Sequence, residues 1–278
     1  MSSTQRYSIS AAEPQGRSPY RLLALDLDGT IISLDLQVDP RDEAALARAR
    51  ERGLLVAACT GRPYSGAVRW VEHLHLTEPL ICYQGAQVRA ADGSLLLDHG
   101  IPHELAMEVV HFCRERRLHL NAYRDDRLLV EHDTPDGRAY ARHSGLETHV
   151  VSDLDLAMGP TSPKLVIVAA EEVVEALLPE VRERWRGRLF VATSLPTYLE
   201  MTMPGAHKGT ALEFLAGYLQ VPREQVVAAG DGRNDRPMLE WAGLAVAVEG
   251  APAEVLEVAD RVIGPPGTGG VAELLESL

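Results

Sequence analysis

Short apolar runs alternate with segments of helical pattern at both ends of the chain. Near the N-terminal end, apolar runs define the segments 21–30, 54–61 and 79–86, and predicted helices at 40–52 and 63–74 separate them. Uninterrupted apolar runs of this length are typical of strands that are buried on both faces. The alternation of strand and helix therefore predicts a parallel sheet with helices on its faces.

The pattern changes between residues 86 and 203. A helix is predicted at 103–117, and the segment 118–132 has the pattern of a hairpin with Arg124-Asp125-Asp126 near its turn. The order helix, strand, helix, strand, strand is then expected at 136–147, 164–170, 171–185, 188–194 and 198–203. Because this order differs from the preceding one, we predict that 86–203 is a separate inserted domain.

The alternation of strands and helices seen near the N-terminal end resumes at residue 204. Helices are expected at 208–220, 234–243, 251–259 and 269–278, with strands at 225–231, 244–248 and 260–264. We therefore predict an α/β fold whose parallel-sheet core is formed by 20–85 and 204–278. Residues 1–19 contain Ser, Gln and Pro without periodicity, which predicts a disordered tail.

Composition indicates an ordinary globular chain. Apolar residues make up 46% and charged residues 24% of the 278 positions, which suits a buried core. The apolar runs are shorter than the ~18 residues that span a bilayer, and the N-terminal segment lacks the apolar centre of a secretory signal. The three cysteines show no CxxC spacing, so we expect buried thiols in a reducing compartment and a soluble, cytoplasmic protein.

The net charge of −13 disfavours polyanionic partners. Acidic residues number 40 against 27 basic ones, and no run of Lys or Arg forms a basic stripe. We therefore expect neither nucleic acid nor a membrane as partner, whereas a small anionic substrate remains compatible. Only Lys164 and Lys208 are lysines, and the lysine at 208 suggests a site where arginine does not serve.

Polar residues follow three of the predicted parallel strands at their carboxyl ends. Asp26 and Asp28 follow the first, Thr60 the second, and Asp231 a strand about 200 positions later, while Lys208 begins a helix that enters the same region. In an open α/β sheet the ligand crevice lies at the carboxyl ends of the strands. We therefore expect these side chains to converge.

The residue types suit a phosphate and a hard cation. Mg²⁺ prefers one or two carboxylates together with water and phosphate oxygens, and Asp26 with Asp231 could supply them. A lysine ammonium and a hydroxyl are donors for phosphate oxygens. The segment 230–235 contains glycines but lacks the Gly-Lys-Ser/Thr of a nucleotide-binding loop.

Four motifs in order resemble those of the haloacid dehalogenase superfamily: LDLDGT (25–30), CTGR (59–62), HKGT (207–210) and GDGRND (230–235). The continuation after the fourth motif and the position of the insertion resemble the Cof-like branch. The resemblance covers 20–278 and implies a Rossmann-like parallel-sheet core with an inserted α/β cap domain.

The resemblance also implies roles for single residues. Asp26 would be the nucleophile that forms an aspartyl-phosphate, and Asp28 the general acid and base. Asp26, Asp28, through its backbone carbonyl, and Asp231 would hold Mg²⁺. Phosphate binding would fall to Thr60, Gly61, Lys208 and Asn234, with Asp235 behind them positioning Lys208 or a metal-bound water.

Plainer interpretations stand beside these roles. Thr60 could cap the following helix, and Asn234 could do the same for its own. Arg62 and Arg233 flank motif residues and could reach substrate or merely be solvated. Lys164 is interpreted as a cap strand end with a lid contact. The histidine spacings do not match a zinc pattern.

Two segments depart from the branch pattern. Gln84-Gly85-Ala86 stands where Asn-Gly-Ala is usual, and AVEGA (247–251) replaces Met-Gly-Asn-Ala. We expect a Mg²⁺-dependent phosphatase acting on a small phosphate ester such as a sugar phosphate. A phosphomutase of the same superfamily and a non-catalytic phosphometabolite-binding module are the alternatives.

Overall fold

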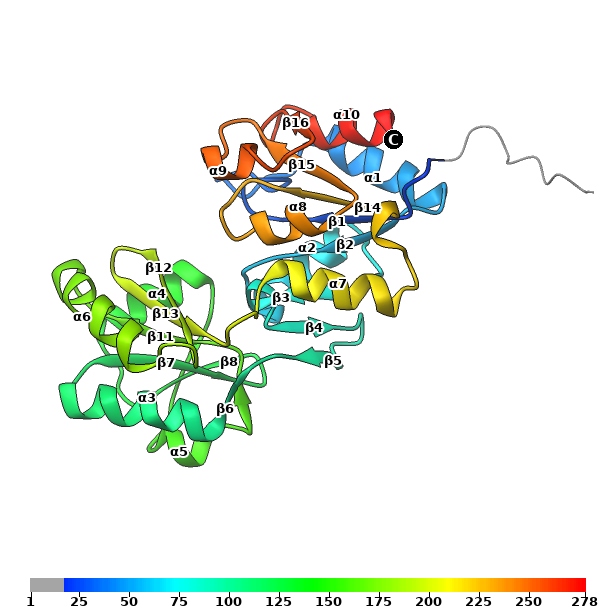
Figure 1. Ribbon diagram of the computed structural model, residues 1–278. Helices are drawn as coiled ribbons and strands as arrows, with labels where there is room; N and C mark the ends of the chain where they lie inside the picture. The colour runs from blue at the N-terminus through cyan, green and yellow to red at the C-terminus, as the bar shows by residue number, and fades with distance from the viewer. Residues whose placement is uncertain (1–17) are drawn as a thin grey trace, which may run out of the picture.

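The computed structural model describes residues 18–278. Figure 1 shows two parts joined by two chain crossings, one between β5 and β6 and one between β13 and α7. Most of the tail predicted at 1–19 lies outside the described residues. Within 18–278 no helix is long and apolar enough to cross a membrane.

The first part is built on a five-stranded parallel sheet with the order β16-β15-β14-β1-β2. This confirms the α/β fold and the parallel sheet that strand–helix alternation predicts. Its strands are β1 (Leu22–Leu25), β2 (Leu55–Ala58), β14 (Val226–Gly230), β15 (Leu244–Val248) and β16 (Arg261–Ile263).

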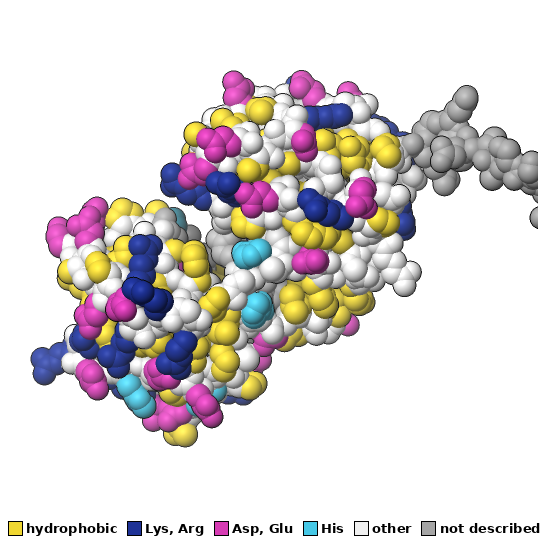
Figure 2. Space-filling view, in the orientation of Figure 1, with side chains coloured by type: hydrophobic (Ala, Val, Ile, Leu, Met, Phe, Trp, Pro, Cys, Tyr) yellow, Lys and Arg dark blue, Asp and Glu magenta, His cyan; other side chains and the backbone are white. Residues whose placement is uncertain are grey.

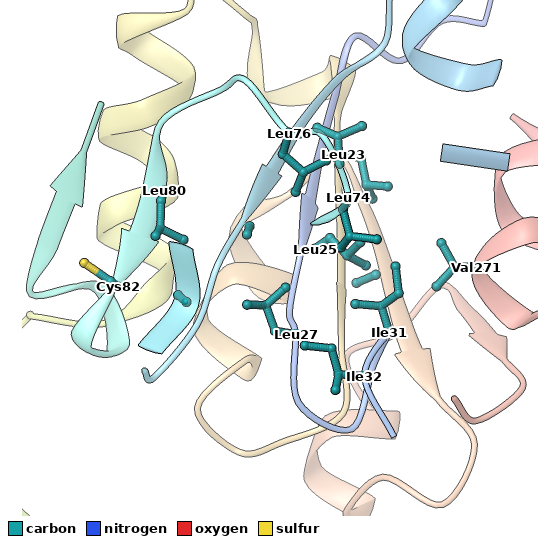
Figure 3. Close-up of a cluster of buried hydrophobic side chains, with 14 of the residues drawn as sticks. Leu23, Leu25, Leu27, Ile31, Ile32, Leu74, Leu76, Leu80, Cys82 and Val271 are labelled. Carbon is teal, nitrogen blue, oxygen red and sulfur yellow. The ribbon is translucent and has the colours of Figure 1, made fainter. Parts of the chain in front are cut away.

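Helices cover both faces of this sheet because alternate side chains of each strand point in opposite directions. Leu23 and Leu25 of β1 pack in one cluster with side chains of α1 and α10, and Figure 3 shows them beside Leu74 and Leu76. Leu22 and Ala24 pack with α7 and α8 on the other face. The helices are α1 (Pro40–Glu51), α2 (Tyr64–His73), α7 (Lys208–Tyr218), α8 (Arg236–Trp241), α9 (Ala253–Leu256) and α10 (Gly270–Ser277).

The third predicted strand joins the parallel sheet only through a single bridge, between Ile81 and Cys59 directly after β2. This strand, β3 (Leu80–Cys82), otherwise pairs antiparallel with β4 (Gln87–Arg89), which pairs with β5 (Leu95–Asp98). Val88 of β4 lies in the same buried cluster as the side chains of α7. β4 and β5 therefore pack on the first part, although the sequence pattern grouped these residues with the insertion.

The second part contains a six-stranded mixed sheet with the order β12-β13-β11-β7-β8-β9. The predicted hairpin is confirmed, because Arg124 pairs with Arg127 across a two-residue turn. The strands are β7 (His119–Arg124), β8 (Arg127–Val130), β9 (Thr148–Val150), β11 (Leu165–Val168), β12 (Phe190–Leu195) and β13 (Tyr198–Thr202). A small pair, β6 (Ile101–Pro102) and β10 (Thr161–Ser162), lies nearby.

The two faces of the second sheet differ in what they contact. Leu165 and Ile167 of β11 pack with α3 (His103–Arg116) and α6 (Glu171–Arg184). Val166 and Val168 point to the other face, where α4 (Pro135–Ser144) lies and the first part begins. This second face therefore looks toward the carboxyl ends of the parallel strands. A short helix, α5 (Leu154–Ala157), completes the part.

Candidate active site

Three neighbouring strands bring the predicted residues together. Asp26 follows β1, Thr60 lies two residues beyond the end of β2, and Asp231 follows β14. These strands are adjacent in the order β14-β1-β2, so their carboxyl ends meet at one edge of the sheet. The expected convergence of these positions is therefore observed.

Lys208 is the centre of the cluster. It is the first residue of α7 and is completely buried. Its Nζ donates to Asp26 Oδ1 and to Asp235 Oδ1, each at 2.5 Å. A buried ammonium is tolerated only when it is paired and hydrogen-bonded, and these two carboxylates meet that requirement.

Burial shapes the electrostatics of these groups. It raises the pKa of Asp26 well above the usual range, as does Asp235, whereas Lys208 lowers it. Burial lowers the pKa of Lys208, but Asp235 and Asp26 outweigh that effect and raise it. Lys208 therefore remains a cation and partly compensates the surrounding carboxylates.

Asp235 organises the loop after β14. Its Oδ2 accepts from the backbone N–H of Asp231 at 3.0 Å and of Gly232 at 2.8 Å, while its Oδ1 accepts from Lys208. Both oxygens of this buried carboxylate are thus engaged by the protein. Asp235 fixes Lys208 and the backbone of the loop at the same time.

Asp231 lies directly against the turn after β1. Thr30 Oγ1 donates to Asp231 Oδ1 at 3.1 Å. Gly29 has a φ of +85°, and a Cβ at that position would lie 2.4 Å from Asp231 Oδ2. Glycine is therefore required there both by the backbone conformation and by the approach of the carboxylate.

The donor set fits a hard divalent cation. Among the described residues, carboxylate oxygens of Asp26, Asp231 and Asp235 lie within 4.8 Å of one another. Oxygen ligands at this density are what Mg²⁺ and similar ions bind. The resemblance implies Asp26, Asp231 and the backbone carbonyl of Asp28 as metal ligands, and the carboxylate of Asp235 lies in the same cluster as the first two.

Asp28 is held by an arginine. Its side chain is 48% exposed, and its two oxygens accept from Arg62 Nε at 2.6 Å and Nη2 at 2.5 Å. This bidentate geometry is the strongest form of an arginine–carboxylate pair. Arg62 is therefore directly engaged with a motif residue.

Thr60, Gly61 and Asn234 surround the same space. Thr60 is buried, and its Oγ1 accepts from the backbone N–H of Arg62 at 3.1 Å. It is not the N-cap of α2, because that position is Pro63. Asn234 Nδ2 donates to Gln84 Oε1 at 2.9 Å. A Cβ at Gly61 would lie 2.4 Å from Gln84 Nε2, so Gln84 is packed between the two motifs.

A cavity of about 720 Å³ opens over these residues and is shared by the two parts of the chain. Figure 2 shows the notch where the parts meet, with basic and acidic side chains interspersed over both. From the first part, Asp26, Asp28, Thr60 and Asp231 line it. From the second part, the lining includes Tyr140, Arg142, His143, Lys164, Tyr198 and Glu200.

Lys164 lies on the cavity face of the second sheet. Its side chain is 8% exposed, and its Nζ is 3.4 Å from Glu200 Oε1 and 5.7 Å from the ring centroid of Tyr123. Burial lowers the pKa of Lys164, but Glu200 and Tyr140 outweigh it and raise the value. The second lysine is thus a buried cation at the cavity wall.

Several residues of the site were not assigned from sequence. Gln84 was noted only as a departure from a family pattern, and Arg62 was left between substrate contact and solvation. Thr30 and Glu200 were not named. No local signal identifies Glu200. The period-2 alternation of the strand at 198–203 would only have narrowed the candidates to the residues on one of its two faces.

The chain is similar to known proteins over most of its length. The family model described as haloacid dehalogenase-like hydrolase matches residues 23–275. The 5-amino-6-(5-phospho-D-ribitylamino)uracil phosphatase YitU of Bacillus subtilis is 30% identical over 93% of this chain and 97% of its own. The HMP-PP phosphatase of Serratia proteamaculans is 28% identical over 84% and 85%.

Solved structures agree with this similarity. The crystal structure of TM0651 from Thermotoga maritima superposes with a TM-score of 0.87 at 31% identity, covering 93% of this chain and 97% of that one. A haloacid dehalogenase-like hydrolase from Bacteroides thetaiotaomicron gives 0.85 at 26% identity, covering 93% and 99%.

Proposed function

Because this chain belongs to the haloacid dehalogenase-like hydrolase family, we propose that it is a Mg²⁺-dependent phosphatase that hydrolyses a small phosphomonoester through an aspartyl-phosphate. The observation that carries the proposal is the buried Lys208, which is bonded to Asp26 and Asp235 directly behind the cavity that Asp26 and Asp231 line. The names of two relatives, both phosphatases of phosphorylated metabolites, support the same reaction class.

Asp26 and Asp28 carry the two chemical steps. A carboxylate oxygen of Asp26 bonds to phosphorus, the bond from phosphorus to the ester oxygen breaks, and Asp28 gives its proton to the leaving alcohol. Asp28 then takes a proton from water, the water oxygen bonds to phosphorus, and the Asp26–phosphorus link breaks to release inorganic phosphate. A covalent intermediate divides one difficult displacement into two easier ones.

The bidentate pair with Arg62 orients Asp28 for these transfers. Both oxygens of Asp28 are occupied by the guanidinium. For Asp28 to carry a proton, one of these hydrogen bonds must open, and its half-exposed position at the cavity leaves room for that. Arg62 thus fixes the orientation of the Asp28 carboxylate at the cavity until one of these bonds opens.

The phosphate is held by donors on the first part of the chain. Lys208 supplies charge next to the nucleophile, while Thr60, Gly61 and Asn234 border the adjoining space. Positioning and charge neutralisation provide most of the catalysis of phosphoryl transfer. This arrangement keeps the transferred group in line with Asp26.

Asp26, Asp231 and the backbone carbonyl of Asp28 would hold Mg²⁺. Asp235 lies close enough to join them, but both its oxygens are engaged by Lys208 and by backbone N–H groups, so we assign it to positioning. When bound, the ion neutralises charge on the phosphoryl oxygens.

The second part of the chain acts as a cap that contacts the leaving group. Lys164, Glu200 and Tyr198 form the cavity wall opposite the phosphate residues. Because β4 and β5 pack on the first part, we place the start of the cap near residue 101 rather than at 86. The second crossing, between β13 and α7, supports an end of the cap near residue 203.

The three cysteines suit a cytoplasmic location. All are free and buried within the described residues, and burial raises the pKa of Cys59, Cys82 and Cys113 to about 12. Such thiols neither form a disulfide nor require an oxidising compartment.

The test is phosphate release from a panel of phosphometabolites, with Mg²⁺ and with excess EDTA. We expect release from at least one ester, loss of release in EDTA and its return when Mg²⁺ is restored. Release that is unaffected by EDTA would contradict the metal assignment. If no ester is hydrolysed while the protein binds phosphometabolites, the non-catalytic alternative is correct.

A further inference from the structure

One carboxylate of the cap reaches across to the first part of the chain. Asp126 lies in the two-residue turn of the β7–β8 hairpin. Its Oδ1 accepts from the backbone N–H of Tyr64 at 2.8 Å and from the hydroxyl of Tyr83 at 2.8 Å. Its Oδ2 accepts from the backbone N–H of Ser65 at 2.5 Å. Three hydrogen bonds therefore cross from cap to core at one side chain.

These hydrogen bonds cap the N-terminus of α2, for which the helix's own sequence provides no side-chain acceptor. The first N–H groups of a helix have no partner within the helix, and a side-chain acceptor just before it usually satisfies them. The N-cap of α2 is Pro63, which makes no such bond. The carboxylate of Asp126 takes its place, and negative charge at a helix N-terminus is favourable.

The hairpin turn is shaped to present this side chain. Asp125 has a φ of 48° and Asp126 a φ of 63°. Two successive residues with positive φ make the tight turn that joins twisted antiparallel strands, and Asp is among the residues that tolerate it. The geometry of the turn therefore fixes the position of the Asp126 carboxylate.

The segments that Asp126 holds lead directly to the phosphate site. α2 follows Thr60, Gly61 and Arg62, the last of which pairs with Asp28. Tyr83 begins a turn in which Tyr83 and Gln84 have φ values of 52° and 61°. Backbone strain of this kind persists only where the surrounding structure enforces it.

Hydrogen bonds tie the two segments to each other and to the opposite side of the site. Tyr83 N–H donates to Arg62 O at 2.9 Å, and Gln84 N–H to Thr60 O at 3.1 Å. Gln84 in turn accepts from Asn234. Gly85 is so close to α7 that a Cβ would lie 2.3 Å from His207 O and 2.7 Å from the nitrogen of Lys208.

We propose that Asp126 is a positioning residue for phosphoryl transfer: docking of its carboxylate orders the loops 60–62 and 83–85 around the phosphate. The inference rests on the proposed function. Asp126 does not line the cavity, so it acts through these loops and not through the substrate. Its effect on turnover is therefore the same for every leaving group.

The experiment compares Asp126→Ala, Asp126→Asn and Tyr83→Phe with the control Asp125→Ala, whose side chain is 81% exposed in the same turn. Each is assayed with p-nitrophenyl phosphate and with the best phosphometabolite of the panel. We expect kcat/KM of Asp126→Ala to fall about 30-fold, and by the same factor for both esters. Asp126→Asn keeps one acceptor and recovers part of the loss, Tyr83→Phe loses a few-fold, and the control stays within twofold.

Amide hydrogen exchange without substrate provides an independent readout. We expect faster exchange at the loops 60–62 and 83–85 and at the start of α2 (64–66) in Asp126→Ala, and unchanged exchange in Asp125→Ala. A fall confined to the phosphometabolite would show substrate contact and overturn the proposal. So would a lowered melting temperature with unchanged kcat/KM, or unchanged exchange at both loops. Wild-type protein that hydrolyses no ester would refute the proposed function instead, while the exchange result still judges the docking.

Discussion

Replacing Lys208 by arginine keeps the positive charge and changes only the size and geometry of the group that carries it. The side chain is completely buried, and its Nζ lies 2.5 Å from carboxylate oxygens of both Asp26 and Asp235. A guanidinium keeps the positive charge, but it is larger and its donors are fixed in a planar fork. It cannot place one nitrogen at both distances without moving one of the carboxylates.

We expect Lys208→Arg to lower kcat/KM by about 10²-fold or more, which corresponds to about 3 kcal/mol of transition-state stabilisation. Because the position has no free space toward solvent, overpacking should also cost roughly 1–3 kcal/mol of folding free energy. From sequence alone we would expect little change in stability, on the assumption of a solvated crevice. The complete burial of Lys208 contradicts that assumption, so we expect a loss of stability instead.

The assay is steady-state phosphate release together with thermal unfolding. Arg188→Lys is the matched control, because it exchanges the same two residue types in a surface pair with Glu108. The control should keep its activity and its melting temperature. If folded Lys208→Arg retained activity within threefold of wild type, the assignment of Lys208 as the phosphate clamp would be refuted.

Three further predictions concern the nucleophile, the cavity wall and the thiols. Asp26→Asn should abolish turnover, because an amide cannot form the aspartyl-phosphate; a rate above one tenth of wild type would exclude Asp26 as nucleophile. Lys164→Met should change the ranking of phosphometabolites by tenfold or more in kcat/KM while p-nitrophenyl phosphate is hydrolysed within threefold of wild type, because Lys164 lies on the cap side of the cavity; equal losses on all esters would contradict a role in leaving-group choice. Iodoacetamide at pH 8 should label none of the three cysteines in the folded protein and all three in denaturant, because burial raises the pKa of each thiol to about 12; mass spectrometry of native protein with one label would contradict this.

The sequence predicted the positions that depend on sheet geometry. Asp26, Thr60 and Asp231 each come after an apolar run, and adjacent parallel strands necessarily bring such positions to one edge. The hairpin around Asp125 could also be predicted from the sequence, because turn residues stand between two runs of strand-forming residues.

Contacts between distant side chains were not predictable in this way. The pair of Arg62 with Asp28 and the capping of α2 by Asp126 depend on how separate elements are placed, and no local pattern records that placement. The antiparallel pairing of the strand at Leu80–Cys82 with β4 was not predicted for a related reason. An apolar run predicts burial but does not specify which neighbour the strand pairs with.

The alternation of side chains along β11 and β13 separates two properties that evolution must adjust independently. Lys164, directly before β11, and Tyr198 and Glu200 of β13 line the cavity, whereas Leu165, Ile167 and Leu199 pack in the cluster on the opposite face. Substitution at every second position can therefore alter which ester is accepted without loosening the core behind the sheet. New ester specificities can therefore arise on this sheet at little cost to folding. A directed library would vary only the face that lines the cavity.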